Sequence, residues 1–404
     1  METELFMAAL GVEEPVYVDA VVFDNASGEL HIHMDFRSGG RFACSECGAS
    51  NLPVLDTTDK VWRHLNFFQY RCFIHMRTPR TRCPTCGARL WVPPWGRAQS
   101  GFTTLFEAFV MVLAKDMPIS RIGALVGEHD TRIWRIVRHH IGRAYADKTF
   151  ESAEKIGCDE TSVRKGHKYV TVFADMASGK TLFVAKGRSS GALEALAAEL
   201  PKHNAAPEQV MEITMDMFPA YISGAADHFP QAGITFDKFH VIQALGLAMD
   251  QVRREEQKTN PLLKHTRYIW LKNQNNLTVK QKTLLETLRF ENLKTAKVYQ
   301  MKLTFQDIYR GIWEPKAADE AIKKWLSWAV RSRLAPIISF AKLVKRHYAG
   351  IIRYFETRLT TGTMESINSR IQEIKRRAKG FRNIDNFISM IYLKTAGLQM
   401  GIHT

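Results

Sequence analysis

The chain has 404 residues, enough for two or three domains that each bury a core of their own. Hydrophobic residues make up 45% and charged residues 24% of the chain, values typical of a soluble globular protein. Lys and Arg number 56 against 41 Asp and Glu, which gives a net charge of +15. This excess favours a polyanionic partner, although charge alone does not separate such a protein from a merely basic one.

The first 97 residues carry strand patterns and two cysteine pairs. Residues 16–23 are rich in β-branched and aromatic residues, and apolar residues alternate with polar ones over 30–36, so both segments are expected to be strands. Two CxxC motifs follow, each with a glycine directly after its second cysteine. A CxxC turn lets two thiolates reach one tetrahedral ion, and the glycine permits the positive φ of such a turn. We expect one structural Zn²⁺ on four ligands, namely Cys44, Cys47, Cys83 and Cys86.

Other residues of this arm are weaker ligand candidates. His64 and His75 are alternative ligands with poorer spacing, and Cys72 and Cys158 lie within apolar stretches that indicate core positions. Arginines around the cysteine pairs are suited to phosphate contacts or to a solvated surface; Arg63 and Arg80 are the two we assign to DNA.

Residues 101–148 predict helices, with a break at residues 117–118. Apolar residues over 120–126 are followed by Gly127, and a second helix is expected over 131–145. One side of that helix is apolar, and a basic side carries Arg132, Arg135 and Arg138. This division is what the recognition helix of a helix-turn-helix requires, and a plain helical hairpin with a charged exterior is the alternative.

The segment from residue 155 onward begins with strands and ends with helices. Strands are expected over 155–163, 169–174 and 181–185, then a helix over 190–200, and then strand 210–215, helix 219–228 and strand 233–236. A meander followed by alternating elements is a mixed α/β pattern that fits an RNase H-like sheet. Residues 238–356 predict an all-helical insertion. Two further helices are expected over 363–398, with a break at residues 379–380.

Three carboxylates stand where they can share a cleft. Asp159 lies where the first of these strands turns polar, Asp216 ends the strand over 210–215, and Glu365 begins the last long helical stretch. Three carboxylates that converge without cations would repel one another, whereas two Mg²⁺ ions, with Mn²⁺ as an alternative, would take their oxygens as ligands. From the pattern alone, unrelated surface carboxylates remain the alternative. His240 is suited either to a phosphate or catalytic contact or to a structural hydrogen bond.

At these residues the chain resembles the ISL-three family of bacterial insertion-sequence transposases over nearly its full length. The matching pieces, in chain order, are Cys44-x-x-Cys47, Trp62-Arg63-His64-Leu65, Pro79-Arg80-x-x-Cys83-x-x-Cys86-Gly87, Asp159-Glu160, Met215-Asp216, Asp237-Lys238-Phe239-His240, Glu365-Ser366-Ile367-Asn368 and Ile374-Lys375-Arg376. The order and spacing together are specific, while no single piece is.

The resemblance implies an RNase H-like DDE domain whose catalytic acids are Asp159, Asp216 and Glu365. It implies binding to terminal inverted repeats of double-stranded DNA, cleavage at the element ends and joining of the 3′-hydroxyls to target DNA. Synapsis of two ends leads us to expect a homodimer on DNA, in the bacterial cytoplasm and nucleoid, with no membrane partner, since no targeting signal or spanning segment is visible. The basic residues after Glu365 would track the DNA backbone, among them Lys375, Arg376 and Arg377.

The expected fold is therefore an α/β, RNase H-like mixed sheet with an all-helical insertion, preceded by zinc-binding and helix-turn-helix domains. Two alternatives stay open: a catalytically silent DNA-binding regulator, and an RNase H-fold nuclease without strand transfer. The expected domains are N-terminal strands with the Cys₄ site, the helix-turn-helix, the first part of the catalytic domain, the helical insertion and the final catalytic helices, over residues 1–98, 99–150, 151–245, 246–357 and 358–404.

Overall fold

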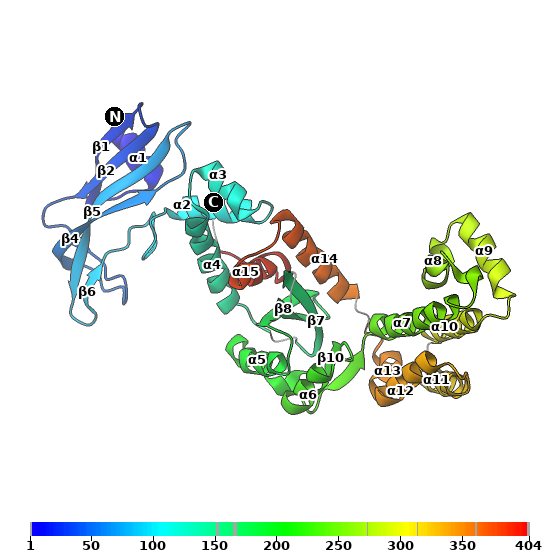
Figure 1. Cartoon of the computed structure of the whole chain (residues 1–404). Coiled ribbons are helices and arrows are strands. Elements are labelled where there is room, and N and C mark those ends of the chain that lie inside the picture. The colour runs from blue at the N-terminus through cyan, green and yellow to red at the C-terminus, as the bar shows by residue number, and fades with distance from the viewer. Residues whose placement is uncertain are drawn as a thin grey trace. The chain divides into compact units, whose positions relative to one another are not determined.

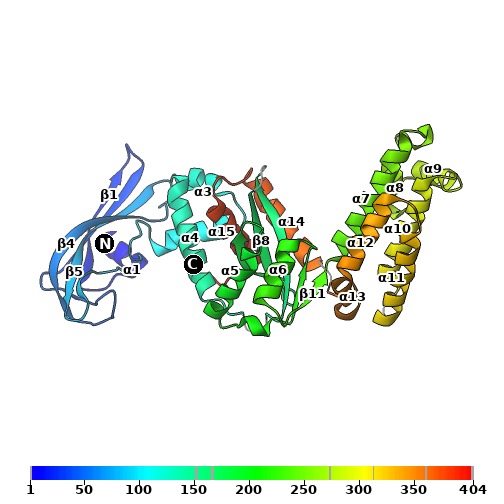
Figure 2. The same cartoon turned by 60° about the horizontal axis from the view of Figure 1, so that its bottom comes forward.

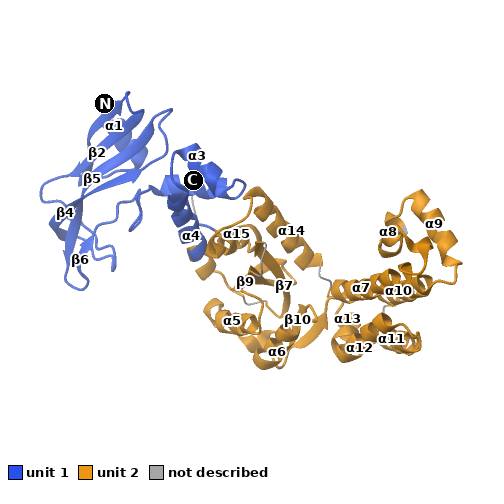
Figure 3. Ribbon diagram, in the orientation of Figure 1, with its two compact units in different colours: residues 1–142, 400–404 blue, residues 143–399 orange. Residues whose placement is uncertain are grey.

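The computed structural model describes residues 2–150, 153–164, 168–272, 274–312, 314–359 and 362–401. It divides the chain into two compact units, one of residues 1–142 with 400–404 and one of residues 143–399 (Figure 3). The finer division into five domains stays a prediction. None of the described helices is long and apolar enough to cross a membrane.

A six-stranded sheet forms the first part of the N-terminal unit (Figure 1). Its strands follow the order β1-β2-β5-β4-β3, with β6 paired to β5, and only β2 and β5 run parallel. The expected alternation is confirmed, since Leu30, Ile32 and Met34 are buried in its core. The helix α1, which packs against β1, was not expected from the sequence. The elements are α1 (Glu2–Leu10), β1 (Val16–Asp24), β2 (Glu29–Phe36), β3 (Arg41–Phe42), β4 (Leu52–Arg63), β5 (Arg71–Cys83) and β6 (Gly87–Leu90).

The helices α2 (Thr104–Ala114) and α3 (Ile119–Val126) and most of α4 (Asp130–Ala146) complete this unit, and α4 ends just beyond its boundary at residue 142. The turn between α3 and α4 begins at Gly127, whose φ of 70° lies in the left-handed region that glycine tolerates without strain. The apolar side of α4 is buried as expected at Ile133, Ile136, Val137 and Ile141. The predicted pair of helices is therefore present with its predicted break.

The C-terminal unit is built on a five-stranded mixed sheet of order β11-β10-β7-β8-β9. The strands β7, β8 and β9 form an antiparallel meander, and β10 and β11 add to β7 in parallel. The meander and the two parallel strands match the predicted RNase H-like arrangement. The elements are β7 (Lys155–Arg164), β8 (Lys168–Asp175), β9 (Lys180–Lys186), α5 (Gly191–Glu199), β10 (Glu212–Met215), α6 (Pro219–His228) and β11 (Gly233–Phe236).

Helices cover both faces of this sheet. Asn368, on the late helix α14 (Gly362–Arg377), bonds to Asp159, while Tyr221 on α6 bonds to Glu160. Successive side chains of a strand point to opposite faces, so α14 and α6 lie on opposite sides of β7. The last helix, α15 (Ile384–Thr395), packs against β9.

A helical insertion stands between β11 and α14. The helices α7, α10, α11 and α12 pack alongside one another around an aromatic core, and Figure 2 shows them as an elongated bundle. An ion pair joins the last helix of the insertion to the sheet, with Arg353 Nη2 2.7 Å from the buried Glu212 Oε2 on β10. The helices are α7 (Lys238–Gln257), α8 (Arg267–Leu271), α9 (Val279–Arg289), α10 (Lys294–Gly311), α11 (Pro315–Val330), α12 (Ala335–Arg346) and α13 (Tyr348–Thr357).

Candidate active site and DNA-binding elements

Asp159 and Asp216 lie on neighbouring parallel strands. The register pairs Lys155 with Glu212 and Gly157 with Thr214, and its one-for-one extension sets Asp159 beside Asp216, the residue directly after β10. Neighbouring strands are about 4.8 Å apart, so the fold brings together two acids that are distant in sequence. Both side chains are half-buried.

A third strand end adds Asp237 and His240. Asp237 follows β11 and caps α7, where its side chain accepts the backbone N–H of Phe239 at 2.9 Å. Its other oxygen lies 3.0 Å from Nδ1 of His240. This hydrogen bond raises the pKa of His240 to about 8 against the opposing effect of burial, and the charges of Asp216, Asp237 and Asp159 act in the same direction. The pKa of this one imidazole therefore depends on acids from three adjacent strands.

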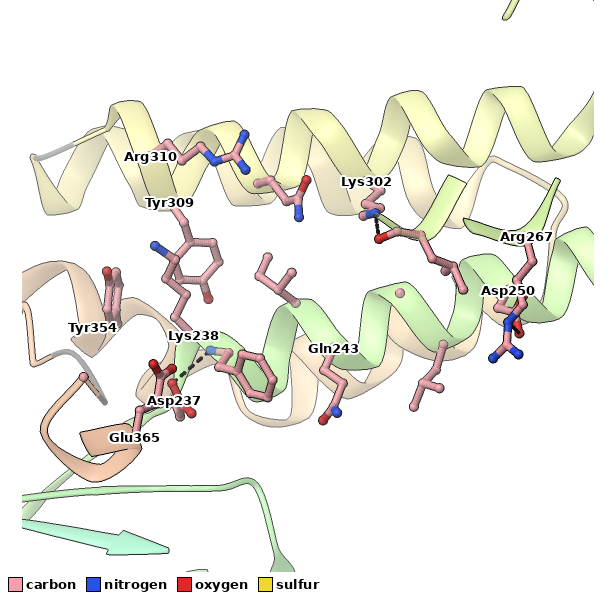
Figure 4. Close-up of a pocket in the computed structure, with 17 residues that line it drawn as sticks. Asp237, Lys238, Gln243, Asp250, Arg267, Lys302, Tyr309, Arg310, Tyr354 and Glu365 are labelled. Atoms are coloured by element: carbon pink, nitrogen blue, oxygen red, sulfur yellow. Dashed lines mark hydrogen bonds and ion pairs between the residues drawn. The ribbon is translucent and has the colours of Figure 1, made fainter. Parts of the chain in front are cut away.

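The helix α14 brings Glu365 to this sheet edge. Asn368 Nδ2 donates to Asp159 Oδ2 at 2.6 Å, and Glu365 lies three residues earlier on the same helical face. Glu365 is exposed and lines one cavity together with Asp237, and both are seen at the same end of it in Figure 4. The helix approaches closely because β7 has a glycine, Gly157, directly beneath Met364.

The electrostatics of Asp159 fit a cation ligand. Burial raises the pKa of Asp159, and the nearby Asp237 charge adds to that rise. The N–H of Glu160, the charge of His240 and the Asn368 amide oppose it. A buried carboxylate among other acids gains most from a nearby cation, and hard oxygen ligands are the donors that Mg²⁺ prefers.

The sequence pattern assigned no role to Asp237 or Asn368, although both stand inside the family motifs. Among the residues that the structure describes, only the four cysteines draw together into a tight ligand group. Asp159, Asp216 and Glu365 do not form such a group among the described residues. Their assignment as catalytic and metal-binding residues stays a prediction.

The four cysteines form a compact cluster. The sulfurs of Cys44, Cys47, Cys83 and Cys86 all lie within 4.8 Å of one another, and those of Cys47 and Cys83 are 3.6 Å apart. Tetrahedral zinc with bonds of about 2.3 Å separates its sulfurs by about 3.8 Å, so the cluster fits this ion. Backbone N–H groups of Cys86 and Thr85 donate to the Cys83 sulfur and lower its pKa to about 7, which favours the thiolate that zinc binds.

The alternative zinc ligands lie outside that cluster. His64 Nδ1 is 2.9 Å from the Thr103 hydroxyl, and His75 Nε2 is 2.9 Å from Nδ1 of His31. Cys72 is buried among apolar side chains of the first sheet. The glycines that follow the cysteine pairs have φ of 71° and 76°, as the turn argument predicted.

Of the predicted DNA-binding arginines, those of α4 are exposed. Arg135 and Arg138 face solvent, while Arg132, also exposed, pairs with Glu128 and lies over the Phe102 ring at 4.4 Å. Among the described residues, Arg135 and Arg138 therefore have no ion pair, whereas Arg132 has one.

The arginines of the zinc arm are placed differently. Arg63 is only 2% exposed, and its guanidinium donates to the carbonyls of His64, Cys72 and Val126. It cross-links the sheet to the helices inside the N-terminal unit and offers no surface for a phosphate. Arg80 is exposed but paired to Asp56 across the strands.

At the basic end of α14, some of the predicted DNA-binding side chains already bond to other residues of the protein. Lys375 Nζ donates to the carbonyl of Ser162 at 2.5 Å, and Arg377 lies 2.6 Å from Glu373. Arg376 is exposed. Lys375 thus ties α14 to β7, one turn beyond the contact of Gln372 with Thr161.

Comparisons with known proteins agree with this geometry. A family model described as a transposase, for the DDE part of the ISL3 group, matches residues 156–391. The helix-turn-helix domain of transposase family ISL3 matches residues 92–141, and the zinc-finger of transposase IS204/IS1001/IS1096/IS1165 matches residues 40–86.

Two curated relatives are similar over most of their length. The transposase for insertion sequence element IS1001 of Bordetella parapertussis is 30% identical over 363 residues, which cover 86% of this chain and 87% of the relative. The transposase for insertion sequence element IS1557 of Mycobacterium tuberculosis is 27% identical over 432 aligned residues, which cover 97% of this chain and 95% of the relative.

Proposed function

Because the chain belongs to the ISL3 (ISL-three) family of insertion-sequence transposases, we propose that it binds the terminal inverted repeats of its element, cleaves at the ends and joins the 3′-hydroxyls to target DNA. The observation that carries this proposal is the strand register that sets Asp159 beside Asp216, with the Asn368 contact holding the helix of Glu365 over them. These acids come from three separate stretches of the sequence, as a shared catalytic site requires.

Asp159, Asp216 and Glu365 would hold two Mg²⁺ ions, with Mn²⁺ as an alternative. When bound, such ions supply an activated oxygen nucleophile and stabilise the leaving oxygen of the phosphodiester. The protein's own residues orient that site. Asn368 fixes one oxygen of Asp159, and the hydrogen bond to Asp237 raises the pKa of His240, whose imidazolium form would offer positive charge to a phosphate.

The DNA-binding helix-turn-helix would read the element ends through α4. Its exposed Arg135 and Arg138 face away from the buried apolar side, as a helix in the major groove requires. Arg376 of α14 would contact phosphates close to the acids. The Cys₄ zinc site would hold the arm's fold, since four protein ligands leave no position for a reacting molecule. Pairing of two ends calls for two copies of the chain, so we propose a homodimer on DNA.

The test combines purified protein, Mg²⁺ and duplex DNA carrying an element end. We expect cleavage followed by joining, and Asp216→Asn should abolish both while DNA binding persists. Asp227→Asn is a matched control, because Asp227 is an exposed acid on α6 that bonds only weakly to Ser223, at 3.4 Å. Normal cleavage by Asp216→Asn would contradict the assignment of the acids.

The same assay separates the alternatives. Cleavage without joining would indicate a nuclease, and binding without cleavage would indicate a regulator. Binding should also weaken with salt, by about 10³–10⁵-fold between ~50 and ~200 mM if ~6–10 phosphates are contacted. A flat salt response would contradict an interface dominated by the DNA backbone.

A further inference from the structure

A cavity of about 680 Å³ begins at the acid site and extends into the helical insertion. It lies between α7 and α10, and Figure 4 shows Asp237 and Glu365 at one end and Asp250 and Arg267 at the other. The volume falls in the range of about 300–1,000 Å³ that is usual for sites binding small organic groups. It is far too small for a DNA duplex, but it is large enough for one nucleotide.

Aromatic side chains line the end of the cavity nearest the acids. Phe239 is 55% exposed on the first turn of α7, although large apolar side chains are usually covered. Tyr309 and Tyr354 line the cavity from α10 and α13, with their rings 5.2 Å apart. Nucleobases of any sequence stack on such rings.

One wall of the cavity contains a buried tyrosine hydroxyl. Tyr309 is 4% exposed, and within the described part of the chain its hydroxyl makes no hydrogen bond. Leaving such a group unsatisfied is unfavourable, and a ligand that bonds to the hydroxyl would remove that cost. Gln306, one turn earlier on α10, lines the same cavity and is 8% exposed. Both groups suit the donors and acceptors of a base edge.

The charged lining residues divide into two groups. Lys302 donates to the carbonyls of Trp270 and Leu271 at 3.1 and 3.2 Å, so its ammonium holds the far wall together. Lys238 and Arg310 line the cavity near the aromatic end, next to Asp237 and Tyr309 respectively in the chain. Cations there are suited to the phosphates on either side of a base that enters the cavity.

We propose that this cavity is a subsite for one unpaired nucleotide of the DNA end, with its base among Phe239, Tyr309 and Tyr354 and its phosphates toward Lys238 and Arg310. The inference rests on the proposed function, because it needs the scissile phosphate to lie at Asp159, Asp216 and Glu365. A nucleotide beside that phosphate reaches the cavity only by leaving the duplex. The subsite would hold the strand in place for attack and would select ends whose flanking base unpairs readily.

The experiment measures the equilibrium binding of the Asp216→Asn variant to duplexes that carry the element end. This variant is used because binding is measured without cleavage of the DNA. Each duplex has a single mismatch, scanned along the nucleotides that flank the cleavage position. A mismatch at the extruded nucleotide removes the cost of unpairing, so affinity should rise there by roughly 10–100-fold and nowhere else.

Pocket variants decide whether this cavity is responsible. Phe239→Ala and Tyr309→Phe, each added to Asp216→Asn, should lose most of the mismatch preference while binding of the matched duplex through α4 persists. Phe290→Ala is the control for the first, because Phe290 is 93% exposed and lies outside the cavity lining. Tyr299→Phe is the control for the second, since Tyr299 is on the same helix and its buried hydroxyl also finds no partner among the described residues, but it does not line the cavity.

The outcomes separate this inference from the proposed function. If the wild-type protein neither cleaves nor joins end DNA, the proposed function fails, and this inference with it. If it cleaves and joins but no mismatch position binds more tightly, only the nucleotide subsite is overturned. Equal preference in Phe239→Ala and in Phe290→Ala would overturn it as well.

Discussion

A single methyl group added at Gly157 tests whether close packing of α14 on β7 determines where Glu365 lies relative to Asp159 and Asp216. An ideal Cβ at this position would lie 2.5 Å from Met176 Sδ and 2.7 Å from Met364 Sδ, well inside ordinary contact. Met364 is 1% exposed and directly precedes Glu365 on α14. The added carbon therefore has to displace the side chain of Met176 and either the side chain of Met364 or the start of α14.

The magnitude follows from the packing. Overpacking a core costs about 1–3 kcal/mol, and methionine side chains adapt easily, so we expect the lower half of that range. For a unit of this size, ~1–2 kcal/mol lowers the melting temperature by roughly 2–8 °C. Displacing a catalytic group by about 1 Å slows a reaction about 10²-fold, so Gly157→Ala should reduce cleavage by roughly 10–100-fold. Binding of matched end DNA should change much less than cleavage, because the helix-turn-helix that we propose reads the ends lies in the other unit.

Calorimetry, single-turnover cleavage and a binding titration measure these three effects separately. Gly142→Ala is the control, because a Cβ at this helical glycine meets nothing within 4 Å and should stabilise α4 by about 0.5–1 kcal/mol. In a double-mutant cycle, Met364→Ala should offset part of the cost of Gly157→Ala. If the effects of the two substitutions on the free energy of unfolding add to within about 0.3–0.5 kcal/mol, the proposed contact of Gly157 with Met364 is refuted. An unchanged cleavage rate in Gly157→Ala would refute its role in placing the acids.

Three further results are expected. Cys83→Ser should reduce bound zinc from about one ion per chain to none and weaken binding of end DNA; unchanged zinc by mass spectrometry would contradict the Cys₄ assignment. The hydrogen bond that His240 Nδ1 donates to Asp237 raises the pKa of His240 to about 8, so the stability it adds is complete below pH ~6.5 and is lost as the pH rises through about 8. NMR titration of the metal-free protein should show this pKa falling toward 6.5 in Asp237→Asn, and an unchanged pKa would contradict the pairing. Asn368→Ala should raise the Mg²⁺ concentration for half-maximal cleavage by about 10–100-fold, and an unaltered Mg²⁺ dependence would show that the contact with Asp159 does not orient a metal ligand.

Local patterns were sufficient for most of the elements. Turn residues and alternation predicted the meander, the helix over 219–228 and the strand over 233–236, and the last two have the bounds observed in the structure. The predicted zinc ligands are the four cysteines that come together. Patterns did not indicate α1, or that residues 52–63 and 71–83 form two long paired strands, because their polar and apolar residues alternate irregularly.

The role of an individual charged side chain was harder to predict. Arg63 was assigned to DNA with the other arginines of the zinc arm, yet it is buried, because three backbone carbonyls from separate segments converge on its guanidinium. The sequence gives no sign of where such carbonyls point. The sequence also could not predict the cavity wall at Tyr309, because that wall depends on how α10 packs against α7.

By itself, the sequence determined what each segment is: its periodicity, its turns, its thiolate pairs and its excess of positive charge are all local properties. Which acids are neighbours was decided by the tertiary structure alone, through the parallel register of β7 and β10 and the glycine that admits α14. The physical reason is that strand pairing and helix packing join residues more than 200 positions apart, such as Asn368 and Asp159, through contacts that no local pattern encodes.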